Sequence, residues 1–133
     1  NVLLNTKVKS NVKVLIRRGR IMSKAIATRL KAIDEKASLK LSDVADLLKV
    51  RPETVSRWNQ GKAFPQPEPE QRLLELGYIV EQLAELYEPD EARLWLLSPQ
   101  RLLRGEKPVD LIRGGRFQEV LNIVHQLQEG VYL

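Results

Sequence analysis

The sequence predicts an all-α fold made of two small helical parts. From residue 23 onward, apolar side chains recur at every third or fourth position, which is the period of an amphipathic helix. Pro and Gly residues divide this pattern into segments of helix length. The alternating pattern of a strand occurs only within residues 1–20, and no second strand is evident nearby to pair with it.

Residues 1–22 form a basic extension that we leave out of the predicted fold. They carry six Lys or Arg side chains and no acid. Met22 followed by Ser23 is typical of a natural chain start, so the extension is interpreted as either upstream sequence or an expression remnant. We expect it to be either non-native or poorly ordered.

Residues 23–64 predict three helices. The first begins at Ser23, carries apolar residues at i, i+4 and i+7, and ends near Lys36. Ser42 is a good N-cap for a short second helix. Pro52 suits the first turn of a third helix, which Gly61 ends as a C-terminal cap.

Residues 65–69 are predicted to be a stiff, extended linker. Pro at positions 65, 67 and 69 disfavours a helix there. Few contacts are expected to cross such a boundary, so residues 70–133 are interpreted as a separate helical domain for dimerisation and partner binding.

The long helix expected from about residue 70 to residue 87 has an apolar stripe with two possible uses. The stripe either pairs with a copy of itself in a homodimer or packs on residues 92–127 of the same chain. Shorter helices follow at Pro89 and Pro108, and a last amphipathic helix runs from Phe117 to a stop at Gly130.

Charge is divided unevenly along a chain whose net charge is +5. Residues 24–66 hold nine basic and five acidic side chains, whereas residues 67–92 hold one basic and eight acidic ones. The basic front half either meets a polyanion or is a solvated surface with uneven charge.

Composition excludes most catalytic and metal-binding classes. The chain has no Cys and a single His, His125, which rules out disulfides, thiolate ligands and a two-His metal site. No apolar run approaches the length of a membrane span or a secretory signal. Since no nucleophile–base pair or phosphate loop is evident either, we expect a cytoplasmic binding protein, with no cofactor, metal or small-molecule substrate, rather than an enzyme.

The most specific segment is LSDVADLLKVRPETVSRWNQG, residues 41–61. Two short helices that cross at a tight turn need a small residue at the crossing, which Ala45 supplies. The apolar Val50, Val55 and Trp58 then fill the space between the helices. This segment resembles the helix-turn-helix of Xre and phage-repressor proteins, although Lys49 replaces the Gly typical of the turn.

The geometry of the third helix predicts which of its residues face DNA. With Val55 and Trp58 inward, Glu53, Thr54 and Arg57 face outward. Arg57 is suited to bidentate contact with guanine. Glu53 either accepts from a cytosine amino group or only favours the helix N-terminus. Phosphate contacts are expected at helix ends, from Ser42, Arg51, Gln60 and Lys62, although Ser42 can equally be an N-cap alone.

The second half carries a fixed order of Trp, Pro and Gly positions. They are Trp95-Leu96, Pro99, Leu102, Gly105, Pro108, Asp110-Leu111, Gly114-Gly115, Val120 and Gly130. This order resembles the toxin-binding domain of the Xre/MbcA/ParS-like antitoxins of type II toxin–antitoxin systems, in which a helix-turn-helix also comes first. The resemblance covers about residues 24–133.

The resemblance implies an all-α, usually dimeric antitoxin whose partner is a RES-domain toxin that consumes NAD, or a related ADP-ribosylating toxin. It further implies that the C-terminal end reaches the toxin's active-site cleft. That assigns blocking to Gly130, Val131, Tyr132 and Leu133, and the surrounding toxin-binding surface to Arg113 and Arg116.

Two functions remain open from the sequence. The chain is either an antitoxin that also binds operator DNA and represses its own operon, or a stand-alone dimeric helix-turn-helix regulator without a toxin. The apolar tail, 131–133, either inserts into a partner or folds back on its own domain or on a second copy.

Overall fold

The computed structural model describes residues 24–130, and these residues form helices without any strand, as predicted. The predictions for residues 1–22 and for the tail, 131–133, lie outside the described residues. The N-terminal helix covers residues 24–37. The elements that follow are α2 (Leu41–Leu48), α3 (Pro52–Asn59), α4 (Pro67–Leu83), α5 (Pro89–Leu97), the 3₁₀ helix η1 (Arg101–Leu103), α6 (Pro108–Arg113) and α7 (Phe117–Gln128).

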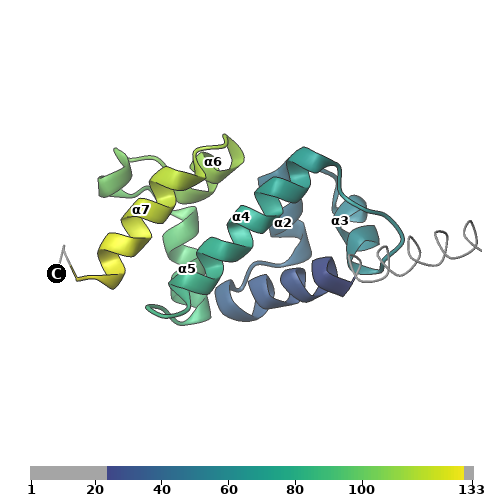
Figure 1. Ribbon diagram of the computed structural model, residues 1–133, viewed down its shortest axis with the longest axis horizontal. Helices are drawn as coiled ribbons and strands as arrows, with labels where there is room; N and C mark the ends of the chain where they lie inside the picture. The colour runs from purple at the N-terminus through teal and green to yellow at the C-terminus, as the bar shows by residue number, and fades with distance from the viewer. Residues whose placement is uncertain (1–23, 131–133) are drawn as a thin grey trace, which may run out of the picture.

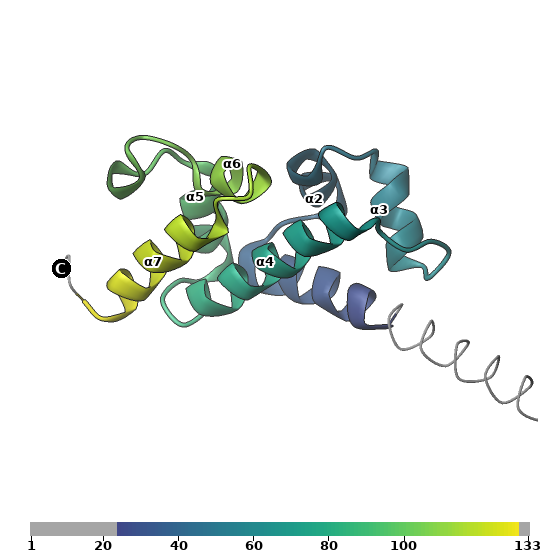
Figure 2. The ribbon, with the colours of Figure 1, turned by 45° about the horizontal axis from the view of Figure 1, so that its top comes forward.

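Helix α4 runs through the middle of the described fold (Figures 1 and 2). The N-terminal helix, α2 and α3 lie on one side of it, and α5, α6 and α7 lie on the other. α4 packs against α2 as well as against α6 and α7. One continuous hydrophobic core results, and it draws side chains from both predicted parts, among them Leu30, Val44, Val55, Leu76, Val80, Leu96, Ile112 and Val124.

The prediction of an extended linker is wrong for residues 67–69, which are helical. Pro67 and Pro69 lie in the first turn of α4, which begins three residues earlier than expected. The first turn is the one part of a helix where Pro loses no hydrogen bond, because those N–H groups have no intrahelical partner. The same helix ends at Leu83, not near residue 87. Only residues 60–66 therefore separate α3 from α4.

The apolar stripe of α4 is used within the chain. Leu73, Leu76, Val80 and Leu83 are buried in the core described above. Of the two uses expected for this stripe, packing on the chain's own second half is the one observed.

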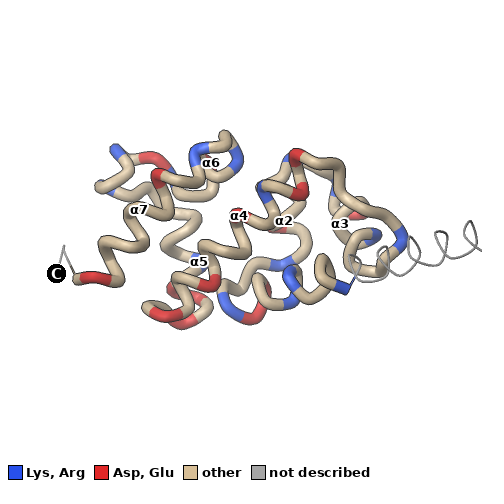
Figure 3. The backbone as a smooth tube through the Cα atoms, viewed as in Figure 1, with Lys and Arg blue, Asp and Glu red and all other residues tan. Residues whose placement is uncertain are grey.

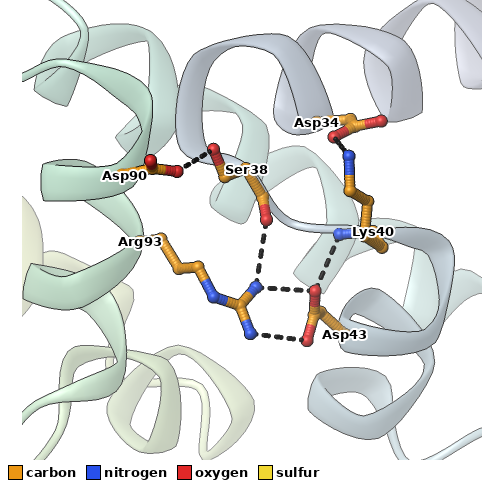
Figure 4. A network of polar contacts seen from close by, with 6 residues as sticks. All are labelled: Asp34, Ser38, Lys40, Asp43, Asp90 and Arg93. Carbon is orange, nitrogen blue, oxygen red and sulfur yellow. Dashed lines mark hydrogen bonds and ion pairs between the residues drawn. The ribbon is translucent and has the colours of Figure 1, made fainter.

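Polar contacts also join the two parts, at the N-terminal end of α2 (Figure 4). The Arg93 guanidinium of α5 reaches both carboxylate oxygens of Asp43, with Nη1–Oδ2 at 2.7 Å and Nη2–Oδ1 at 3.2 Å. Arg93 Nη1 also donates to the Ser38 carbonyl at 3.0 Å. Hydrogen bonding from Arg93, more than any other cause, holds the pKa of Asp43 below its usual value, while partial burial opposes the shift.

The side chain that caps the N-terminal end of α2 is Asp43, and not Ser42. Its carboxylate accepts the backbone N–H of Lys40, the N-cap residue, at 2.8 Å. Ser42 lies one residue inside the helix, so the prediction that it is the N-cap is wrong. Sequence reasoning missed this arrangement because Ser is the more usual cap and Lys40 has no acceptor of its own to offer.

A second arginine holds the C-terminal end of α2. Arg113 of α6 donates from Nε to the Leu47 carbonyl at 2.9 Å and from Nη2 to the Asp46 carbonyl at 3.3 Å. These carbonyls belong to the last turn of α2, which carries partial negative charge; the Asp46 carbonyl also accepts the Lys49 N–H at 3.3 Å. We call Arg93 and Arg113 together the α2 clamp, since they hold α2 at its two ends.

Candidate functional site

The helix-turn-helix packs as its sequence pattern predicts. Ala45 is fully buried where α2 and α3 cross, and Val55 and Trp58 are buried between them. Val50 is half-buried against the same core. Because Val55 and Trp58 fix the rotation of α3, the opposite face of this helix is turned outward.

Lys49 occupies the turn in a left-handed conformation, with φ of 56° and ψ of 42°. This is the conformation that the Gly typical of the pattern adopts freely, and it costs a non-Gly residue about 1–2 kcal/mol. The turn nevertheless closes, since the Val50 N–H donates to the Ala45 carbonyl at 3.0 Å. Replacement of the Gly therefore leaves the geometry of the motif intact.

The predicted DNA-contacting residues are brought together on α3 and its ends, with one exception. Glu53 and Arg57 are exposed on the outer face of α3, and Thr54 beside them is half-buried. The exposed Arg51 is the N-cap of α3 and Gln60 its C-cap. Figure 3 shows basic positions along this element and just beyond it. The remaining residues are Lys62, which is exposed and follows Gly61 with its positive φ, and Ser42, which is exposed on α2 and not on α3.

The predicted toxin-binding residues are not brought together. Arg113 is engaged at the end of α2, and Arg116 precedes α7, where it pairs with Glu119 and, at 3.3 Å, with Glu106. Gly130 follows the opposite end of α7. A helix of 12 residues is about 18 Å long, so the two arginines are not close to the start of the tail. Arg113 and Arg116 therefore lie away from Gly130, and their role in toxin binding stays a prediction.

Sequence reasoning missed an exposed apolar face on α5. Leu94 is 68% exposed, more than any other large apolar side chain of the described residues, and Leu97 is exposed one turn later. The core-facing residues of α5 are Ala92 and Leu96, so the two leucines occupy the other side of the helix. The signal was available, because LWLL supplies apolar residues to both faces of one short helix. Exposed Leu102 follows in η1.

Within residues 24–130, no three His, Cys, Asp or Glu side chains are placed to hold a metal ion. His125 is half-buried on α7. In the same part of the chain, no helix is both long and apolar enough to cross a membrane. The features that remain are two surfaces, the polar and basic outer face of α3 and the apolar outer face of α5.

Comparisons with known proteins identify both parts of the chain. Residues 82–130 match the family described as the antitoxin Xre/MbcA/ParS C-terminal toxin-binding domain. The mycobacterial cidal antitoxin MbcA of Mycobacterium tuberculosis is 38% identical over 108 residues, which are 81% of this chain and 96% of MbcA, and the MbcA of Mycobacterium bovis matches equally. A probable mycobacterial cidal antitoxin of M. tuberculosis is 32% identical over 91 residues, 68% of this chain and 77% of that protein.

The fold agrees with a solved structure. One chain of the crystal structure of the M. tuberculosis MbcT–MbcA toxin–antitoxin complex superposes with a TM-score of 0.72 at 38% identity, over 80% of this chain and 96% of that chain. The matched length includes the helix-turn-helix as well as the C-terminal helices. These matches also support the prediction that the chain is not an enzyme. The chain belongs to the Xre/MbcA/ParS family of antitoxins.

Proposed function

We propose that the protein binds and blocks the active site of a RES-type, NAD-consuming toxin and represses its own operon by binding operator DNA as a cytoplasmic homodimer. The observation that supports this most is the near-complete alignment with MbcA, because 96% of that antitoxin is covered by a chain that carries both interfaces. The solved relative comes from a complex of antitoxin and toxin, which supports a toxin as partner here too.

The toxin-binding contribution is assigned to the outer face of α5 and to the residues after α7. Leu94, Leu97 and Leu102 all lie within the segment that matches the toxin-binding domain. Burying exposed leucines against a protein partner is favourable by roughly 2 kcal/mol for each side chain that becomes fully buried. This face therefore supplies affinity, and it need not enter the catalytic cleft.

Blocking is assigned to Gly130 and the tail. Gly130 adopts a positive φ of 73°, so the backbone leaves the axis of α7 at this residue. Tyr132 has a ring that can stack where a nucleotide base would lie in a NAD-binding cleft. Arg116, which is exposed at the other end of α7, is assigned to the periphery of the complex.

The experiment measures NAD turnover by the partner toxin with this protein in excess. Full-length protein should inhibit completely. A chain without Val131–Leu133 should still bind the toxin, more weakly, yet release NAD turnover. Leu94→Glu should instead lower the affinity for the toxin while a saturating concentration still inhibits. Complete inhibition by the truncated chain would disprove blocking of the active site by residues 131–133. Inhibition would then come from the helical surfaces.

DNA binding is supported by the geometry of α3. A major groove admits one α-helix, and the outer face of α3 offers Arg57 for a guanine while Arg51, Gln60 and Lys62 lie at its ends for phosphates. A stand-alone regulator would show the same DNA binding. Co-purification with the toxin separates the two functions, because only an antitoxin forms that complex.

A further inference from the structure

Phe64, in the segment between α3 and α4, is a large apolar residue exposed beside the helix-turn-helix. Its side chain is 47% exposed, and no other large apolar side chain within residues 24–66 is exposed. The other exposed large apolar residues of the described part belong to α4, α5, η1 or the segment between α4 and α5. A single exposed apolar residue is ordinary on a protein surface, but Phe64 is also rigidly held and surrounded by basic groups.

The backbone on both sides of Phe64 is anchored to the protein. Just before it, the Lys62 N–H donates to the Arg57 carbonyl at 2.9 Å. Ala63 is half-buried against the hydrophobic core, and Pro65 is buried. Because both neighbours pack on the protein, the ring of Phe64 is directed outward on a fixed backbone. A side chain held in this way loses little conformational entropy when a partner covers it.

The charge around Phe64 fits a polyanion. Residues 54–67 carry two basic side chains, Arg57 and Lys62, and no acid. Both ribbon views place the segment after α3 at the same end of the described fold as α3, and away from α5 and α7 (Figures 1 and 2). The exposed leucines of α5 lie instead within residues 82–130, which match the toxin-binding domain. The surroundings of Phe64 therefore fit DNA better than they fit a toxin.

The length of α3 determines which part of the DNA Phe64 reaches. A helix of eight residues is about 12 Å long, close to the width of a major groove. With α3 in the groove, its C-terminal end meets the groove wall, where Lys62 is expected to contact a phosphate. Phe64 follows two residues later, after at most about 7 Å of backbone. Its ring therefore reaches past that phosphate to the sugars and base edges of the adjoining minor groove.

We propose that Phe64 packs against the sugars and base edges of the minor groove beside the major groove that α3 reads. The contact is uncharged and buries the exposed part of the ring, so it adds affinity that salt does not remove. It complements Arg57, which is assigned to a base, and Lys62, which is assigned to a phosphate. The inference rests on the proposed binding of operator DNA and extends that surface beyond α3.

The first test measures binding of the full chain to a labelled duplex taken from upstream of the protein's own gene. Phe64→Ala should weaken binding at least about fivefold at every salt concentration and leave the salt dependence unchanged. Lys62→Ala should instead reduce the salt dependence. Phe64→Leu should recover most of the affinity, because Leu is also apolar. Leu102→Ala, at an exposed leucine of η1, is the matched control and should bind as the wild type does.

The second test locates the ring on the DNA by photo-crosslinking. Phe64 is replaced by the analogue p-benzoylphenylalanine, the bound complex is illuminated, and the nucleotides that become attached are mapped. They should lie outside the guanines whose N7 atoms the protein protects from methylation, since those atoms face the major groove. The same analogue in place of Leu94 is the control, and it should not attach to DNA because α5 lies on the other side of α4 (Figure 1).

Three results would overturn the proposal. The first is equal affinity of Phe64→Ala and the wild type for the duplex. The second is a reduced salt dependence in Phe64→Ala, which would mean that only phosphate contacts were disturbed. The third is attachment of the analogue at position 64 to a second copy or to the toxin instead of DNA. If Phe64→Ala fails to fold by circular dichroism, Phe64→Leu and the crosslink still decide.

The proposed function and this inference fail in different ways. A wild type that binds no duplex from upstream of its own gene would contradict operon repression and the contact of Phe64 together. A wild type that binds this duplex, with a Phe64→Ala variant that binds equally well, would contradict the contact of Phe64 alone.

Discussion

The outer faces of α3 and α5 belong to one core and yet present opposite chemistry. Residues 49–62, which include α3, carry four basic side chains and one acid, and no large apolar side chain among them is exposed. The face of α5 and η1 exposes three leucines. A polyanion meets the first through charge, whereas a folded protein meets the second by burying apolar area. A small shared core thus presents two outer surfaces of different chemistry.

The α2 clamp connects these two regions. Arg93 neutralises Asp43, an acid of the helix-turn-helix, from the other half of the chain. Arg113 stabilises the far end of the same helix through its carbonyl groups. The pairing of Asp43 leaves the segment around α3 with its basic excess, so α5 contributes to the charge balance of the helix-turn-helix.

The largest expected effect tests whether the core is truly shared. Leu76→Ala, at a fully buried position near the middle of α4, should lower the free energy of unfolding by about 2–5 kcal/mol. Because both parts pack on α4, they should unfold together. Trp58→Phe and Trp95→Phe backgrounds leave one Trp in each part, so fluorescence reports the two parts separately, and their midpoints should coincide.

Separate midpoints would contradict a shared core and would restore the boundary predicted from the prolines. A fragment that begins after residue 64 gives the same information in another way. The predicted independence of such a fragment depended on few crossing contacts, but α4 packs on α2 and the α2 clamp crosses this boundary. We therefore expect the fragment to be much less stable than the full chain.

The next effect separates base reading from phosphate contact on α3. Arg57→Ala should weaken operator binding by about 1–3 kcal/mol and leave the fold unchanged, because the side chain points outward. Lys62→Ala should weaken binding to all sequences alike and reduce the salt dependence of the affinity. Titrations of operator and scrambled DNA at several salt concentrations distinguish the two. Unchanged operator affinity in Arg57→Ala would exclude Arg57 as a base reader.

A smaller effect is expected from the α2 clamp. Arg93→Ala should lower the free energy of unfolding by about 1 kcal/mol, since Arg93 and Asp43 are both partly exposed and solvent screens the pair. Arg101→Ala, at an exposed arginine of η1, is the control and should be neutral. Urea denaturation of Arg93→Ala, Asp43→Asn and the double variant measures the coupling energy, which would be zero if the pair contributed nothing.

The dependence of stability on pH gives an independent test of the pair formed by Arg93 and Asp43. Since the pKa of Asp43 is lowered in the folded state, its stabilisation is complete above the ordinary aspartate pKa of about 3.9 and is lost as the pH falls through the lowered value. Between about pH 5 and pH 2, wild-type stability should therefore fall more steeply than that of Arg93→Ala. Equal slopes would show that the Arg93 hydrogen bonds do not cause the shift.

The sequence predicted local structure better than it predicted the relation between distant segments. The period of apolar residues, together with the Pro and Gly positions, located the α-helices of the described residues, and the buried Ala45, Val55 and Trp58 confirm the packing of the helix-turn-helix. The Pro-rich segment was misread, because Pro disfavours a helix interior but suits a first turn, and only packing on α2 shows that α4 continues there. The contacts of Arg93 and Arg113 with α2 were not predicted, because their partners lie 50 or more residues away in the sequence. Arg113 and Arg116 precede Gly130 by fewer than 20 residues in the sequence, but the 12-residue helix α7 separates them from it in space.

The smallest expected effect compares a similar turn in each half. Lys49 and Arg104 both close a turn with positive φ, 56° and 60°, where Gly is free of strain. Replacing Lys49 by Gly relieves about 1–2 kcal/mol of strain, but the added entropy of the unfolded chain costs about 0.4–1 kcal/mol. A net stabilisation between about 0 and 1.6 kcal/mol, with a centre of about 0.8 kcal/mol, is expected. Lys49→Ala keeps the strain and removes the charge, so it should not stabilise. Arg104→Gly should gain less than Lys49→Gly, because it also loses the 3.0 Å ion pair with Glu119. Thermal unfolding of the three variants measures this order, and equal stabilisation by Lys49→Ala would show that charge, and not backbone conformation, is what Lys49 contributes at the turn.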